Sequence, residues 1–223
     1  MTVRRSLELA LLVAIVLCHA GCGVAQLVGG MAQNYEYEKK VQRFAEYDDL
    51  EGRSVAVVVD ADMATLYEHP HVIRHISENV AGRLNQNVPD IRVMNPQNVL
   101  VWQHRTPQWN AMPYGEIAEE LNVDRVVYIE LYEYRLHPPG NRWEWDGVCA
   151  GSVGIIERGS ILSDSFSDQF NVVGRFPGRR GIAREDASAD RIEMGVLHEF
   201  IQQVAWLFHE HEAPKYPDRY RGR

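Results

Sequence analysis

Cysteine is scarce in this sequence, since only 3 of its 223 residues are cysteine. Three cysteines cannot form the several disulfides that hold small secreted scaffolds together. Basic residues are also outnumbered, because 23 Lys and Arg face 31 Asp and Glu and leave a formal charge of −8. Sequence-independent binding of DNA or RNA needs a dense positive field. We therefore expect no nucleic-acid partner.

Long hydrophobic runs and known catalytic motifs are missing as well. The longest apolar stretch, Leu9–Cys18, has about ten residues, whereas a membrane-spanning helix needs about 20. The chain contains no G-x-S-x-G, no Walker loop, no G-x-G-x-x-G and no H-E-x-x-H. These absences predict a chain without a bound cofactor and without a recognisable catalytic centre.

The first residues have the pattern of an export signal. Arg4 and Arg5 give a basic start, the apolar stretch follows, and Ala20, Gly21 and Cys22 end the segment with small residues. A basic start, a short apolar segment and a small-residue cleavage site are typical of a secretory signal peptide.

The Ala-Gly-Cys ending resembles the lipobox of bacterial lipoproteins. That resemblance implies cleavage before Cys22, with the lipid attached to this cysteine and the domain facing the periplasm. It also favours the outer membrane, because Gly23 stands where some bacteria use Asp to retain lipoproteins at the inner membrane. We therefore expect a signal peptide over 1–21 and a lipidated cysteine with a flexible tether over 22–40, where Gly29-Gly30 marks a break.

The first half of the remaining chain alternates strands with helices. A continuous β-branched run over 54–60 is typical of a central strand that is buried on both faces. Pro70 suits the first turn of a helix near 70–86. A short strand over 91–94 and helices over 96–104 and 113–122 follow, the first of them capped by Asn95.

The second half reads as an antiparallel meander and a long helix. We expect strands over 124–136, 142–157 and 163–173, and a helix from Ser188 that crosses the sheet. The middle of 142–157 has only small residues, which favours close approach of a helix. The fold class is therefore α/β, with one mixed sheet and helices packed on it, over a single domain 41–212 and a frayed tail 213–223.

Three expectations concern individual positions in these strands. Glu130, Tyr132 and Tyr134 should share one strand face, opposite Leu131, Glu133 and Arg135. Phe166, Phe170 and Val172 should likewise share one face of the strand over 163–173. Cys149 lies within a strand without a helix N-terminus beside it, which favours a buried, unreactive thiol.

Two groups of residues are candidates for metal ligands. Asp60 and Asp62 follow the central strand and resemble the D-x-D motif of metal-dependent glycosyltransferases, although two aspartates also simply end a strand in a turn. His71 and His75 share a helix face, with Glu68 or Glu78 as a third ligand. Surface histidines are the alternative interpretation.

Two other groups of residues are candidates for binding a partner. Trp143 and Trp145 start a strand near Tyr132 and Tyr134, and such a cluster is either core or the centre of an interface. Four arginines gather in one loop, which either docks an anionic partner or is simply solvated. These arginines are Arg175, Arg179, Arg180 and Arg184.

The combined pattern resembles one group of envelope lipoproteins. A lipobox, a short tether, a first strand of the VAVVV kind, then IRVMNP and NVDRVVYIEL, an antiparallel return and a final helix occur together. This order is similar to the penicillin-binding-protein activators, the curli-secretion-channel lipoproteins and the N-terminal domain of the Tol-system propeller protein. The resemblance implies a non-enzymatic, membrane-anchored module that binds another envelope protein or self-associates. The alternative is a metal-dependent envelope enzyme that uses Asp60 and Asp62, or His71 and His75.

Overall fold

The structure, a computed structural model, describes residues 39–160, 164–178 and 181–215. These residues divide into a small unit, 39–42 with 212–215, and a larger unit over 43–211. The strands of the small sheet, β1 (Lys40–Arg43) and β9 (His211–Pro214), pair with each other. Ala213 and Pro214 therefore lie in a strand, whereas the sequence predicted a frayed tail from residue 213.

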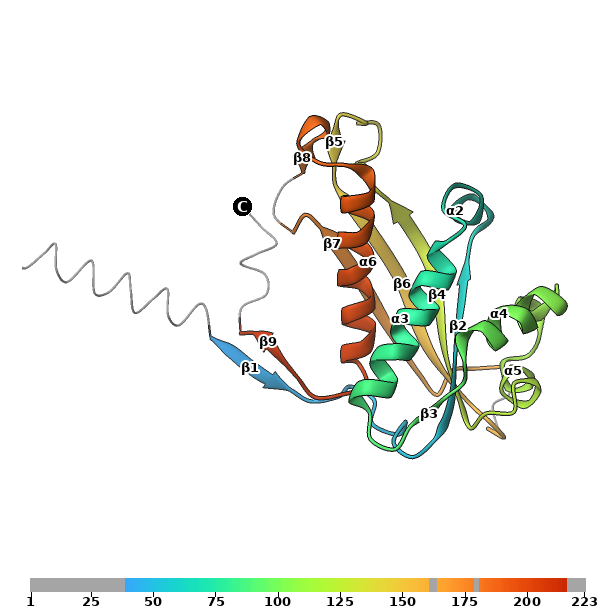
Figure 1. The fold of residues 1–223 in the computed structure, drawn as a ribbon. Helices are drawn as coiled ribbons and strands as arrows, with labels where there is room; N and C mark the ends of the chain where they lie inside the picture. The colour runs from blue at the N-terminus through green and yellow to red at the C-terminus, as the bar shows by residue number, and fades with distance from the viewer. Residues whose placement is uncertain (1–38, 161–163, 179–180, 216–223) are drawn as a thin grey trace, which may run out of the picture. The chain divides into compact units, whose positions relative to one another are not determined.

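The larger unit is built on a five-stranded mixed sheet with the order β3-β2-β4-β6-β7 (Figure 1). β2 pairs in parallel with both of its neighbours, whereas β4, β6 and β7 form an antiparallel meander. The predicted fold class is confirmed. The strands are β2 (Ser54–Ala61), β3 (Arg92–Val93), β4 (Arg125–Arg135), β6 (Gly147–Glu157) and β7 (Asp168–Phe176).

Helices connect or cover these strands. They are α2 (Met63–Glu68), α3 (Val72–Asn87), α4 (Pro96–Arg105), α5 (Tyr114–Glu120) and α6 (Ala189–Trp206). The predicted caps are present: the Asn95 side chain accepts a hydrogen bond from the Gln97 amide at 2.9 Å, and the Ser188 hydroxyl accepts one from Arg191. The short helix α2 was not predicted. No helix in the described part of the chain is long and apolar enough to cross a membrane.

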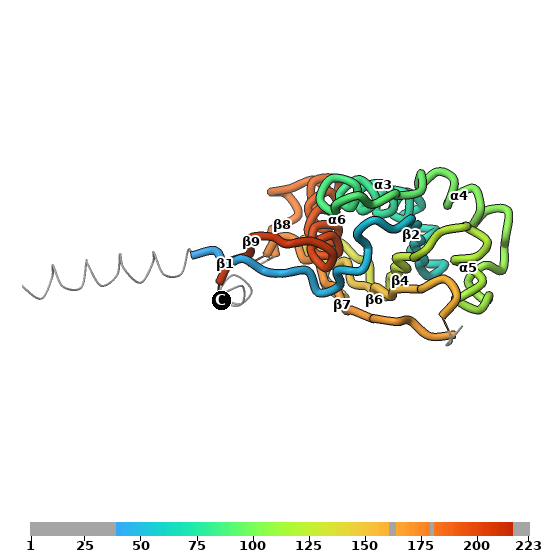
Figure 2. The backbone as a smooth tube through the Cα atoms, turned by 90° about the horizontal axis from the view of Figure 1, so that it is seen from below, coloured from blue at the N-terminus to red at the C-terminus, as the bar shows by residue number. Residues whose placement is uncertain are grey.

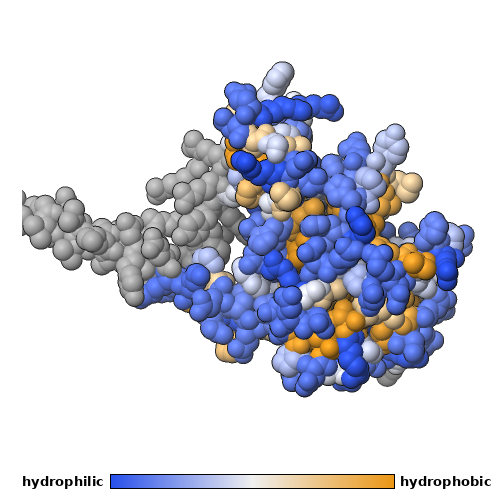
Figure 3. All heavy atoms as spheres, viewed as in Figure 1, coloured by the Kyte–Doolittle hydropathy of each residue, from blue (hydrophilic) through white to orange (hydrophobic). Residues whose placement is uncertain are grey.

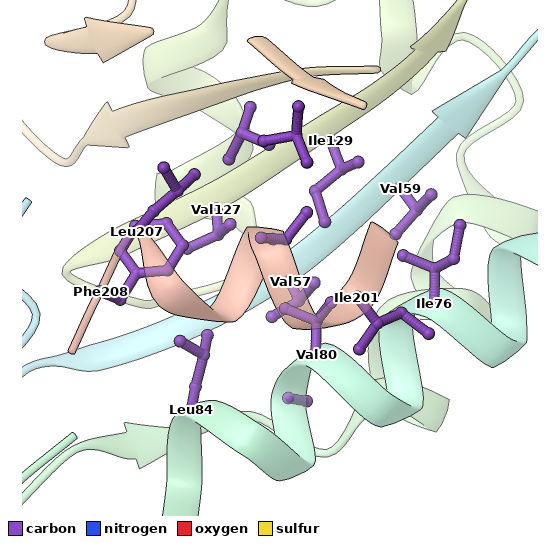
Figure 4. Packing of buried hydrophobic residues seen from close by; sticks show 14 of the residues in the cluster. Val57, Val59, Ile76, Val80, Leu84, Val127, Ile129, Ile201, Leu207 and Phe208 are labelled. Atoms are coloured by element: carbon purple, nitrogen blue, oxygen red, sulfur yellow. The ribbon is translucent and has the colours of Figure 1, made fainter. Parts of the chain in front are cut away.

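The main core lies between one sheet face and the two long helices, α3 and α6, which run side by side (Figure 2). Odd-numbered residues of β2 and β4, such as Val57 and Ile129, point toward Ile76 and Val80 of α3 and Ile201 of α6 (Figure 4). The strand alternation puts these residues on one face. The residues of β2 from Val55 to Val59 are buried on both faces, as a central strand requires.

A second core lies on the opposite face of the sheet. There Val58 and Tyr128 pack against Val99 of α4 and Ile117 of α5. Phe166 joins this second core, where its ring stacks on Tyr114 with centroids 4.3 Å apart. The prediction that Phe166 shares a face with Phe170 and Val172 is therefore wrong. Phe166 precedes β7, so the strand alternation does not fix its direction.

Small residues in β6 and β7 let α6 approach the sheet closely. A Cβ atom on Gly174 would lie 2.5 Å from the Phe200 backbone nitrogen, and one on Gly151 would lie 3.2 Å from the Phe200 ring. The close helix approach predicted from the small residues of β6 is confirmed.

A β-bulge interrupts the register between β4 and β6. Leu131 pairs with Gly151 and Glu133 pairs with Ala150, so Tyr132 has no partner of its own. One inserted residue reverses the alternation beyond it. Tyr134 therefore shares the α6 face with Leu131, and the prediction that it shares a face with Glu130 is wrong.

Candidate functional site

A groove of about 800 Å³ opens where β4 ends and the chain turns toward β6. We call it the aromatic groove. It lies beside a two-stranded ribbon in which β5 (Glu144–Trp145) pairs with β8 (Ile182–Ala183). Its lining includes His69, Tyr134, His137, Arg142, Trp143, Trp145 and Arg184.

The ribbon holds two distant segments together. The Arg184 amide donates a hydrogen bond to the Trp143 carbonyl at 3.0 Å, and the Arg184 guanidinium donates one to the Arg142 carbonyl at 3.1 Å. These bonds fix the position of Arg184 against the loop that carries Trp143. The groove wall is therefore formed by backbone pairing as well as by side-chain packing.

Trp145 is the fixed part of the groove. Its side chain is buried, and its indole N–H donates to the carbonyls of Arg184 at 3.2 Å and Ala187 at 3.0 Å. The His137 ring stacks on it at 4.3 Å between centroids, and the Arg184 guanidinium carbon lies 5.4 Å from the ring centroid. The sequence left open whether the tryptophans belong to the core or to an interface. Trp145 is a core residue.

Trp143 is the exposed residue of the aromatic groove. Its side chain is 81% exposed although Trp145, two positions further on, is 4% exposed. The Trp143 amide donates to the Asn141 side-chain oxygen at 3.0 Å, which fixes the turn before it. A large aromatic side chain held out into solvent on a hydrogen-bonded turn is the kind of residue that anchors protein interfaces.

A polar cluster lies next to the groove and ties three elements together. The Glu193 carboxylate of α6 accepts a hydrogen bond from the Tyr134 hydroxyl at 2.9 Å and contacts the His71 ring nitrogen at 2.7 Å. The His69 ring nitrogen lies 3.7 Å from the same carboxylate oxygen. Burial, followed by the negative charge of Glu193, raises the pKa of Tyr134. The tyrosine therefore stays a hydrogen-bond donor.

The structure describes two of the four predicted arginines. Arg184 lines the aromatic groove, whereas Arg175 lies on β7 and does not line it. Arg179 and Arg180 lie outside the described residues. Another arginine, Arg135, lines the groove but is neutralised by ion pairs to Glu133 at 2.8 Å and Asp146 at 3.3 Å.

A second cavity, of about 900 Å³, lies at the carboxyl end of β2, beside the middle of β4. Asp60, Asp62, Glu130 and His104 line it. Asp60 and Glu130 are direct register partners on neighbouring strands. Burial raises the pKa of the Asp60 carboxyl, and hydrogen bonds from the Ala61 amide and the Tyr128 hydroxyl only partly offset this effect. Crevices at this end of parallel strands often bind ligands.

The predicted metal ligands have other roles in the structure. Asp62 caps α2 by accepting a hydrogen bond from the Thr65 amide at 2.7 Å. His71 contacts Glu193, as described above. Glu78 accepts from Gln97, and Glu68 lines the aromatic groove. Among the residues that the structure describes, no three His, Cys, Asp or Glu side chains are placed to share a metal ion.

The two remaining cysteine predictions differ in outcome. Cys149 is a free and buried thiol whose pKa is raised by burial, as an unreactive core cysteine requires. Cys22, the predicted lipidation site, lies outside the described residues.

Comparison with known proteins assigns no family. No family model matches the chain, and no curated protein matches it. The chain is similar to solved structures at low identity. One is the lipoprotein GNA1162 of Neisseria meningitidis, at 12% identity and a TM-score of 0.43, covering 68% of this chain and 97% of that one.

Two further solved structures show a similar degree of likeness. PelC of Paraburkholderia phytofirmans, described as a dodecamer, has 13% identity and a TM-score of 0.42, with 77% and 98% of the two chains covered. The hypothetical protein CT253 of Chlamydia trachomatis has 14% identity and a TM-score of 0.41, with 69% and 96% covered. The function is therefore argued from the chain's own residues.

Sequence reasoning missed several residues of the groove. Arg142, His137 and His69 were not singled out, and Glu193 was treated only as part of a helix. Glu193 meets His71 across 122 positions and Tyr134 across 59. Contacts over such separations leave no periodic signal in a single sequence. The one local signal was Pro138-Pro139, which marks the turn after His137.

Proposed function

We propose that this chain is a lipid-anchored protein of the bacterial cell envelope whose folded domain binds another envelope protein through the aromatic groove. We infer the cellular location from Arg4-Arg5, the apolar stretch over 9–18 and Cys22. In this proposal the lipid holds the domain at the periplasmic face of the outer membrane, and the domain acts without catalysis.

The observation that carries the binding role is the contrast between the two tryptophans. Trp145 is locked by two indole hydrogen bonds and a stacked histidine, whereas Trp143 stands exposed on the same wall. A rigid exposed aromatic residue loses little side-chain entropy on binding and removes a large apolar area from water. This combination supports a protein partner that covers Trp143.

Charges around the groove support a protein of mixed charge rather than a purely anionic one. Arg142 and Arg184 line the groove, and Glu68 lines it too. The neighbouring turn (Arg184–Asp186) adds Glu185 and Asp186. Mixed charges around an aromatic centre are typical of the rim of a protein interface.

The test is crosslinking in cells with the full chain carrying Trp143→Ala. Truncating a central interface tryptophan costs about 2 kcal/mol or more, or roughly thirtyfold in affinity. We expect the principal crosslinked partner to disappear, because Trp143 is the exposed anchor of the groove. Mass spectrometry of the crosslinked bands measures this.

Phe44→Ala is the matched control, since Phe44 is 73% exposed and does not line the groove. This variant should keep the partner. Equal partner lists for the wild type and Trp143→Ala would contradict the proposed site. Because Trp143 is on the surface, its replacement should leave the thermal unfolding temperature unchanged.

A further inference from the structure

The second cavity, which Asp60 and Glu130 line, lies where the chain changes from one face of the sheet to the other. After β2 the chain continues through α2 into α3, which packs on one face, whereas after β3 it continues into α4, which packs on the opposite face (Figure 1). Neighbouring parallel strands whose connections leave on opposite faces have a crevice between them at their carboxyl ends, and open α/β sheets bind ligands in that crevice. The topology therefore places a ligand crevice beside the end of β2.

The short length of β3 leaves room for this crevice. β3 pairs only with the first two residues of β2, so beyond them no strand of the described chain lies on that side of β2. Helix side chains take the place of the strand. The Ser77 hydroxyl of α3 donates a hydrogen bond to the Val57 carbonyl at 3.3 Å. The Gln103 amide of α4 donates one to the Val59 carbonyl at 3.0 Å, and Gln103 also lines the cavity.

The sheet side of the cavity is negatively charged. Asp60 and Glu130 are register partners on parallel strands, so their side chains leave the same face of the sheet from backbones about 4.8 Å apart. Asp60 is half-buried, and Glu130 is exposed. Within the described residues, neither carboxylate has an ion pair with a Lys, Arg or His side chain. A cationic group in the cavity would offset the cost of burying Asp60.

The helix side of the cavity has a positive charge and an apolar surface. Arg74, in the first turn of α3, lines the cavity, and it has no ion pair within the described chain either. The positive end of the α3 dipole adds to this charge. The half-buried Leu66 and Ile73 and the buried Trp109 provide the apolar surface. Ligand sites typically combine an apolar lining with a few polar groups that fix the orientation of the ligand.

We propose that the second cavity binds a small zwitterion with an apolar body, which is the chemistry of a free amino acid or a short peptide. The ammonium group binds Asp60 and Glu130, the carboxylate pairs with Arg74, and the apolar body packs on Trp109. Two carboxylates disfavour a purely anionic ligand, and the unpaired arginine disfavours a purely cationic one. The residues that line this cavity differ from those of the aromatic groove, so the two sites can fail independently.

The test is calorimetric titration of the purified full chain with L-phenylalanine and two analogues that each lack one charge. L-Phenylalaninamide keeps the ammonium group but has no carboxylate, and N-acetyl-L-phenylalanine keeps the carboxylate but has no ammonium group. We expect each analogue to bind about tenfold more weakly than phenylalanine, since a hydrogen bond to a charged group contributes about this factor.

A dipeptide identifies the source of the zwitterion. L-Alanyl-L-phenylalanine has both charges but places them further apart. Tighter binding of the dipeptide would support the site and indicate a peptide ligand, whereas tighter binding of phenylalanine would support the site and indicate a free amino acid.

Two substitutions assign the charges to residues. Glu130→Gln should weaken phenylalanine binding about tenfold without weakening N-acetyl-L-phenylalanine, because that analogue has no ammonium group to lose a contact. Arg74→Gln should weaken phenylalanine binding by a similar factor without weakening L-phenylalaninamide. A variant that is merely misfolded would weaken every probe, and thermal unfolding checks that both variants are folded.

Glu116→Gln and Arg105→Gln are the matched controls, because both residues are exposed on helices and lie outside the cavity lining. Each should bind phenylalanine as the wild type does. The proposal is overturned if none of the four probes binds at millimolar concentration, or if phenylalanine binds no tighter than both analogues. It is also overturned if the control variants weaken binding as much as Glu130→Gln and Arg74→Gln.

Discussion

Individual residues in this chain are best understood from what surrounds them in space. Asp60 and Asp62 look equivalent in the sequence, yet Asp62 caps α2 while Asp60 is half-buried beside Glu130 and Tyr128. Trp143 and Trp145 also differ, because Trp143 is exposed and Trp145 is buried. The residue types and their spacing were visible in the sequence, but the partners that give each residue its role come from distant segments.

Asp60 carries a prediction about pH. Burial raises its folded-state pKa above the unfolded value, so folding favours the protonated form. The stability that this carboxyl contributes is therefore full below its unfolded pKa and is lost as the pH rises through the folded pKa. Asp60→Asn removes the desolvated charge and should stabilise the protein at pH 7 by about 1 kcal/mol or less.

Denaturant unfolding of the wild type and Asp60→Asn at several pH values measures this difference. The gain should shrink toward zero as the pH falls below about 4, where the aspartate is protonated in both states. Tyr128→Phe is a useful comparison, because it removes only the hydroxyl that donates to Asp60. A gain from Asp60→Asn that is constant with pH would contradict the electrostatic explanation.

At the scale of elements, the fold followed from hydrophobic patterns and caps. The β-branched run of β2, the cap at Asn95 and the stripe that starts α6 after Ser188 all predicted the observed elements. Two features of the fold were not predicted from the sequence. The bulge at Tyr132 depends on pairing with β6 rather than on local sequence. The helix α2 has no buried residue, so no apolar period marked it.

The contact of α6 with the sheet carries the second prediction. Gly174→Ala would force a Cβ atom to within 2.5–2.8 Å of the Phe200 backbone and side chain, so α6 would have to move. We expect a loss of about 2–3 kcal/mol in the free energy of unfolding. Thermal or denaturant unfolding measures this loss.

Gly82→Ala is the control at the same scale. Gly82 lies inside α3, and an added Cβ atom there would have nothing within 4 Å, so alanine fits. Alanine should raise stability by about 0.5–1 kcal/mol because glycine is a poor helix former. Equal effects of the two substitutions would show that backbone flexibility, and not the approach of α6, determines the role of Gly174.

For the whole molecule, the proposed function rests on two separate parts of the chain. The N-terminal sequence pattern predicts the location, and the folded domain provides the surface for binding. The surface seen in Figure 3 is mainly hydrophilic, with hydrophobic residues in separate areas. The exposed Trp143 supplies the anchor of the proposed partner site.

The central claim is that a lipid at Cys22 holds this domain in the cell envelope. Mass spectrometry of the N-terminal peptide, taken from the native protein in membranes, tests it most directly. The account predicts a chain that begins at Cys22 with the added mass of acyl groups, and a Cys22→Ser variant that is released from the membrane fraction. An unmodified chain beginning at Met1, recovered from the cytosol, would contradict it.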